Sequence, residues 1–259
     1  GSFGVFGDQM GAQLPVALAI DAAAAGLTAL AVAPLIAAFD EAITRSASGD
    51  KLWVALGERL GSIVTRPVAF LRSTSFLWMW IVYAATYGTA NSLKSIEAAL
   101  HVKLGFVATL LVTLVNMSCG IAKDAAYAKM FGAKDAKDGG SRTPALAFVI
   151  WFVRDLVAFT FILTLPPLIT ARLGVAEELA KFATPVVAQY FTTPLHLLGF
   201  NMCNMPGATI GRQLAAIQPG FFSTVAARQL RIIPPYSIGG VLNGRLLSSA
   251  PLLLGLAKK

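Results

Sequence analysis

Three arginines interrupt long apolar stretches of this chain at a regular spacing. Arg72, Arg154 and Arg231 follow one another at intervals of about 80 residues, and such regularity indicates internal repeats. A guanidinium group presents a planar fork of N–H donors that suits carboxylate and phosphate groups. If the three side chains face a common interior, they form a ring around an anion site. In the alternative, each guanidinium reaches the membrane interface while its stem lies along apolar surface.

Two further polar side chains lie in the same apolar stretches. Asp155 follows Arg154 directly in the segment IWFVRDLVAF, and His196 lies two residues after Pro194 in TTPLHLLGF. An ionisable group inside a membrane span is costly, which makes it a functional-site hypothesis. We therefore predict His196 and Asp155 as a proton or polar site. The alternative is a hydrogen-bonded contact between helices.

The composition of the chain places these residues in a membrane. Of its 259 residues, 56% are hydrophobic and only 13% are charged, and the mean hydropathy is +0.68, whereas roughly 25% of the residues in a soluble domain are charged. Membrane spans need about 20 apolar residues and tolerate internal prolines. The sequence predicts an all-α integral membrane protein that contacts the lipid bilayer, with spans in residues 14–39, 75–90, 104–122, 144–170, 182–205 and 232–257.

The positive charges are distributed unevenly along the chain. About two thirds of the 21 basic residues follow the first, third and fifth predicted spans, so that side is the inside by the positive-inside tendency. The net charge of +8 fits an anionic membrane surface. We therefore expect bound phospholipid, with cardiolipin as one candidate, and no nucleic-acid partner.

A second set of residues repeats with the same period as the arginines. Pro34, Asn116 and Pro194 lie in the odd-numbered spans, again about 80 residues apart, and two independent sets at one period favour a true repeat. The prediction is a single membrane domain, residues 1–259, built from three tandem two-helix units at 12–98, 99–176 and 177–259. Because each unit has an even number of spans, the units are parallel.

This arrangement resembles the mitochondrial carrier family, in which proline lies on odd helices and arginine early on even ones. The segments FDEAITRSASG (39–49), YAATYGTAN (83–91) and RIIPPYSIGGVLN (231–243) are more closely similar to a poorly characterised family of mitochondrial membrane proteins from fungi, algae and protists. The resemblance implies a mitochondrial carrier-like bundle that is a multi-pass protein of the mitochondrial inner membrane.

The charged gate motif of carriers is missing from the expected positions. Carriers end each odd helix with Pro-x-acid-x-x-base, and with Pro34 aligned, Ile36 and Phe39 occupy the acidic and basic positions. We therefore predict a non-transporting accessory or structural subunit of a respiratory or ATP synthase assembly, with other membrane subunits as partners. The alternative is a solute carrier that binds a small anionic metabolite with Arg72, Arg154 and Arg231.

Catalysis is not expected of this chain. It contains only two histidines, His101 and His196, and metal sites in membrane enzymes built on histidine clusters need more. We predict that the protein is not an enzyme and binds no metal or other cofactor.

Overall fold

The computed structural model describes residues 2–132 and 143–253, and within these ranges every regular element is a helix. This confirms the predicted all-α class. Three helical stretches of the described chain are long and apolar enough to cross a membrane, namely Leu14–Ala47, Phe106–Phe131 and Ala145–Leu173. They coincide with the first, third and fourth spans predicted from the sequence.

Six long helical segments make up most of the molecule. Four are continuous: α1 (Ser2–Ala47), α4 (Thr74–Leu100), α5 (Phe106–Phe131) and α9 (Glu177–Asn204). Two contain a π-helical turn: α7 (Ala145–Phe159) passes through η1 (Thr160–Thr164) into α8 (Leu165–Leu173), and α11 (Phe221–Pro234) passes through η3 (Pro235–Gly239) into α12 (Gly240–Leu253). Prolines accompany both turns, because proline lacks an N–H and its ring crowds the preceding helical turn.

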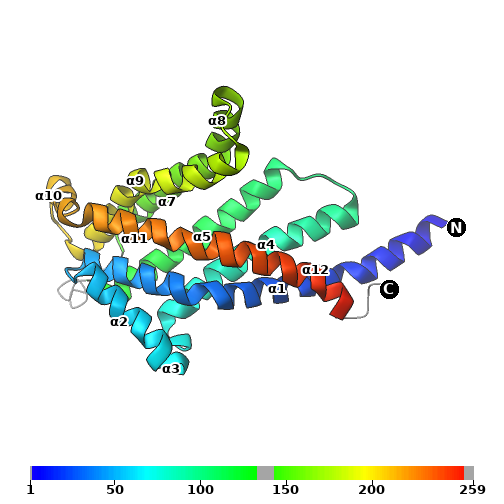
Figure 1. The fold of residues 1–259 in the computed structure, drawn as a ribbon, viewed down its shortest axis with the longest axis horizontal. Coiled ribbons are helices and arrows are strands. Elements are labelled where there is room, and N and C mark those ends of the chain that lie inside the picture. Colours follow the sequence, from blue (N-terminus) through cyan, green and yellow to red (C-terminus); the bar gives the residue numbers. More distant parts are fainter. Residues whose placement is uncertain (1, 133–142, 254–259) are drawn as a thin grey trace.

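Short helices connect the long segments at one end of the bundle. After α1 the chain forms α2 (Leu52–Thr65) and α3 (Pro67–Leu71), and after α9 it forms α10 (Ile210–Ala215) and η2 (Gln218–Gly220). Helix α2 is amphipathic: it buries Leu52 and Leu56 against α1 and leaves its opposite side exposed. Figure 1 shows α2 and α10 at the end of the bundle opposite to α12 and the beginning of α1.

The six long segments close into a ring. Each packs against the next along the chain, from α1 to α4, α5, α7, α9 and α11, and both α11 and α12 contact α1 again. The elongated shape of this bundle is visible in Figure 1, where α8 bends away from the bundle axis while it stays in contact with α9. Ring closure directs one face of every long segment toward a shared interior.

Small residues let α1 lie close to its neighbours. Ala25, Ala29 and Ala33 are buried on α1, and small side chains permit the close helix approach that membrane bundles favour. The indole nitrogen of Trp80 on α4 donates a hydrogen bond of 3.0 Å to the carbonyl oxygen of Gly26 on α1. Helices α1 and α4 are therefore closely packed, and together they form one side of the interior of the ring.

A reciprocal amide pair joins α4 to α12 and provides a test of ring closure. Asn91 donates to Asn243 Oδ1 at 3.0 Å, and Asn243 donates to Asn91 Oδ1 at 2.9 Å. We expect Asn243→Leu to lower the free energy of unfolding by about 1 kcal/mol, because buried Asn91 loses this partner. Unfolding in detergent measures the effect. The double variant Asn91→Leu, Asn243→Leu should recover part of the loss, and an unchanged single variant would contradict the pair.

Candidate functional site

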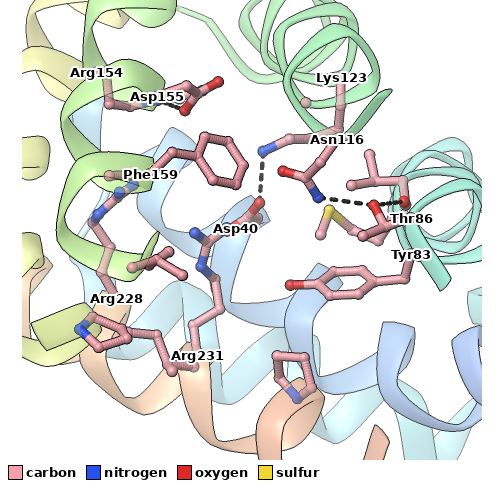
Figure 2. A pocket seen from close by; sticks show the side chains of 18 of the residues that line it. Asp40, Tyr83, Thr86, Asn116, Lys123, Arg154, Asp155, Phe159, Arg228 and Arg231 are labelled. Atoms are coloured by element: carbon pink, nitrogen blue, oxygen red, sulfur yellow. Dashed lines mark hydrogen bonds and ion pairs between the residues drawn. The ribbon is translucent and has the colours of Figure 1, made fainter. Parts of the chain in front are cut away.

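A cavity of about 450 Å³ lies inside the ring of helices. All six long segments contribute to its wall, with Asp40 from α1, Tyr83 from α4, Asn116 from α5, Phe159 from α7, Gln189 from α9 and Arg231 from α11. Figure 2 shows most of these side chains converging on the same space. Ligand pockets for small molecules typically measure about 300–1,000 Å³, so the size suits a metabolite.

Charged side chains gather on one part of this wall. Three carboxylates and four cations line the cavity: Asp40, Asp124, Asp155, Lys123, Arg154, Arg228 and Arg231. Buried charges in a protein are normally paired with one another, because an isolated charge in a low-dielectric interior is very costly. The pairing within this group therefore determines what the cavity can bind.

Asp40 connects three helices through two cations. The ammonium of Lys123 on α5 lies 2.6 Å from Asp40 Oδ2, and the guanidinium of Arg231 on α11 donates to Asp40 Oδ1 at 2.5 Å. Lys123 also lies 2.5 Å from Asp124 Oδ1. These ion pairs hold α1, α5 and α11 together beside the cavity.

Every nitrogen of the Arg154 guanidinium on α7 contacts a neighbouring side chain. Its Nε and Nη2 atoms donate to the two oxygens of Asp155 at 2.7 and 2.9 Å, and Nη1 contacts Asp124. The same Nη1 lies 2.7 Å from His196 Nδ1. Arginine has donors only, so His196 accepts through Nδ1, and its ring proton is assigned to Nε2. The predicted polar pair, His196 and Asp155, therefore meets at Arg154.

The structure brings together two of the three predicted arginines. Arg154 and Arg231 line the cavity, whereas Arg72 is exposed at the end of α3 and outside it. The difference arises because Ser73 caps the first turn of α4, accepting from the backbone N–H of Phe76. Arg72 therefore precedes its helix, while the other two lie within α7 and α11. Arg154 and Arg231 both pair with carboxylates.

Sequence reasoning missed most of the charge cluster. Asp40 and the adjacent Lys123 and Asp124 were not among the predicted site residues, yet they meet in space. Arg228 was overlooked, although it precedes Arg231 by three residues, and residues spaced in this way lie on the same helix face. That spacing was the one signal in the sequence that could have identified it.

Arg228 differs from the other cations in its partners. Its Nε donates to Gln189 Oε1 at 3.0 Å and its Nη2 to Thr192 Oγ1 at 3.3 Å, both on α9. The residue is 4% exposed. Among the side chains that the structure describes, no carboxylate forms an ion pair with it. In the described part of the cavity wall, the hydrogen bonds of the Arg228 guanidinium therefore go to uncharged side chains.

Together, the fold and the site define a helical membrane protein with a charged, metabolite-sized cavity at its centre. Residues 22–250 match the model of the family described as probable citrulline exporter, and the chain belongs to this family. No curated protein and no solved structure matches the chain.

The family match corrects the resemblance to mitochondrial carriers, which was wrong. Six apolar spans with proline and arginine at a regular period are not specific to carriers, and the specific residues were absent, as Ile36 and Phe39 already indicated. The match favours the alternative of a solute transporter over the non-transporting accessory subunit. The apolar helices agree with a membrane location.

Proposed function

We propose that this chain carries citrulline, or a closely similar polar amino acid, across a membrane. The observation that carries the proposal is the cavity lined by all six helical segments and by seven charged side chains. Membership of the citrulline exporter family supports the same substrate class. Function depends on the site and not on the fold alone, and the cavity supports the proposal separately from family membership.

The cavity wall matches the two kinds of surface that such a substrate presents. A polar amino acid has a charged carboxylate and ammonium at one end, a methylene stem, and a neutral polar group at the other end. Apolar side chains such as Met79, Val82 and Ile162 line part of the wall and can contact the stem, while the charged cluster lies beside them. A few polar groups in a largely apolar pocket are typical of ligand sites.

We further propose that all six long segments cross the membrane, in three two-helix units. The closed ring of contacts supports this, because a segment that left the membrane would remove one wall of the cavity. Transport requires the cavity to open to each side in turn. The ion pairs of Asp40 with Lys123 and Arg231 join α1 to α5 and α11, so they would have to shift whenever α1 moves.

Transport by the purified protein in liposomes tests the proposal. Vesicles loaded with unlabelled citrulline should accumulate radiolabelled citrulline by exchange, and excess external citrulline should compete. Empty liposomes provide the background, and glutamate tests the alternative of an anionic substrate. Exchange no faster than the background, with protein shown to be folded and inserted, would overturn the proposal. The mitochondrial inner membrane as its location stays a prediction, which subcellular fractionation checks.

A further inference from the structure

We propose that Arg228 binds the carboxylate of the substrate, with Gln189 and Thr192 holding its guanidinium in place. This inference rests on the proposed function, since it assigns one group of the substrate to one residue of the same cavity. It goes beyond family membership, which names no residue.

The charge balance of the cavity is the first argument. Its wall carries four cations and three carboxylates, and the carboxylates are all engaged: Asp40 with Lys123 and Arg231, Asp124 with Lys123 and Arg154, and Asp155 with Arg154. One positive charge remains, on Arg228. A buried charge without a counter-charge is costly, and a bound carboxylate would supply the missing counter-charge.

The geometry of Arg228 is the second argument. A guanidinium has five N–H donors, and a carboxylate accepts two of them side by side. Gln189 and Thr192 engage Nε and Nη2 with one hydrogen bond each, so both N–H groups of Nη1 and one of Nη2 are available. The available N–H groups of Nη1 and Nη2 point from the tip of the guanidinium, where a carboxylate can bind with two parallel hydrogen bonds.

The supporting residues fix the direction of the fork. The amide of Gln189 donates to the carbonyl oxygen of Pro185 at 3.0 Å, which leaves its own oxygen to accept from Arg228. Pro185 also lines the cavity. Figure 2 shows Arg228 beside Arg231 and Phe159 on the wall. A guanidinium held in this way loses little freedom when a ligand binds, which favours affinity.

Arg154 and Arg231 are poorer candidates for this role. Arg154 uses Nε, Nη1 and Nη2 on Asp155, Asp124 and His196. Arg231 is bound to Asp40, which Lys123 also contacts. A substrate carboxylate at either site would have to compete with an existing protein carboxylate.

The test compares citrulline with citrullinamide, in which the carboxylate is replaced by a neutral amide. For the wild-type protein we expect citrulline to bind and to be transported far better than citrullinamide. Arg228→Gln should reduce citrulline uptake about 100-fold, because it removes a bidentate charged contact, and should abolish the preference between the two compounds. Arg66→Gln is a matched control, since Arg66 is exposed and outside the cavity, and it should retain both uptake and preference.

Binding to the detergent-purified protein, measured by thermal shift with both compounds, separates the possible outcomes. If the wild type transports citrulline and Arg228→Gln still prefers it to the amide, the assignment of Arg228 is wrong while the proposed function stands. If the wild type binds citrulline through Arg228 without transporting it, the function fails and the assignment stands. If the wild type neither binds nor transports citrulline, both fail.

A conservative variant keeps the test decisive if Arg228→Gln does not fold. Arg228→Lys retains the charge but not the planar fork. We expect it to keep the preference for citrulline over citrullinamide with about 10-fold weaker binding, since a point charge replaces a bidentate contact. Loss of the preference in a folded Arg228→Gln together with its retention in Arg228→Lys would support the proposal. A folded Arg228→Lys without any preference would overturn it.

Discussion

Asp40→Asn is expected to lower the free energy of unfolding by about 3–5 kcal/mol, because it removes a buried carboxylate that pairs with two cations and leaves Arg231 without a counter-charge. The Asp40 side chain is 2% exposed and lies within 2.6 Å of Lys123 and 2.5 Å of Arg231. Asparagine keeps the shape of the side chain and removes only its charge. Lys123 retains Asp124, but Arg231 loses its carboxylate partner.

Unfolding of the purified protein in mild detergent measures this effect. Asp50→Asn is the matched control, because Asp50 pairs with Arg45 at the surface and its side chain is 50% exposed. An exposed pair contributes at most about 1 kcal/mol. The double variant Asp40→Asn, Arg231→Gln should recover part of the stability, since neither charge then remains unpaired. Equal effects of Asp40→Asn and Asp50→Asn would show that the cluster does not form.

Gly199→Ala is expected to destabilise the protein by about 2–3 kcal/mol, in the range known for overpacked cores. A Cβ atom at Gly199 on α9 would overlap the indole ring of Trp151 on α7. The ring cannot easily move, because it is fully buried, it donates to the carbonyl oxygen of His196 at 3.3 Å, and it packs against Phe148 and Phe200. The added methyl group should therefore force α7 and α9 apart.

Gly57→Ala provides the contrast to this variant. Gly57 lies on α2, and a Cβ atom there meets no neighbouring atom within 4 Å. Alanine in a helix is favoured over glycine by about 0.5–1 kcal/mol, so this variant should be slightly more stable than the wild type. Thermal unfolding of both variants gives the comparison. If Gly199→Ala were as stable as Gly57→Ala, the close contact between α7 and α9 would be refuted.

The length of α1 shows where sequence reasoning stopped short. The sequence predicts a first apolar span over residues 14–39, and the charged residues Asp40 and Glu41 follow it. In the structure α1 continues to Ala47 with both carboxylates buried. Glu41 lies 2.8 Å from Arg59 on α2, and Asp40 meets Lys123 and Arg231. Two adjacent acidic residues after an apolar stretch resemble the end of a helix. They can nevertheless lie inside a helix when residues distant in the sequence neutralise their charges.

The sequence by itself determined the helical class and the membrane location, because both follow from hydropathy over windows of about 20 residues. It also identified Arg154, Arg231, Asp155 and His196 as unusual, since each interrupts an apolar stretch. Only the tertiary structure decided which charges pair. Asp40 and Arg231 are 191 residues apart in the chain and meet because the ring of helices closes. Among the described cations that line the cavity, that closure leaves Arg228 without a carboxylate partner, a result that no local pattern contains.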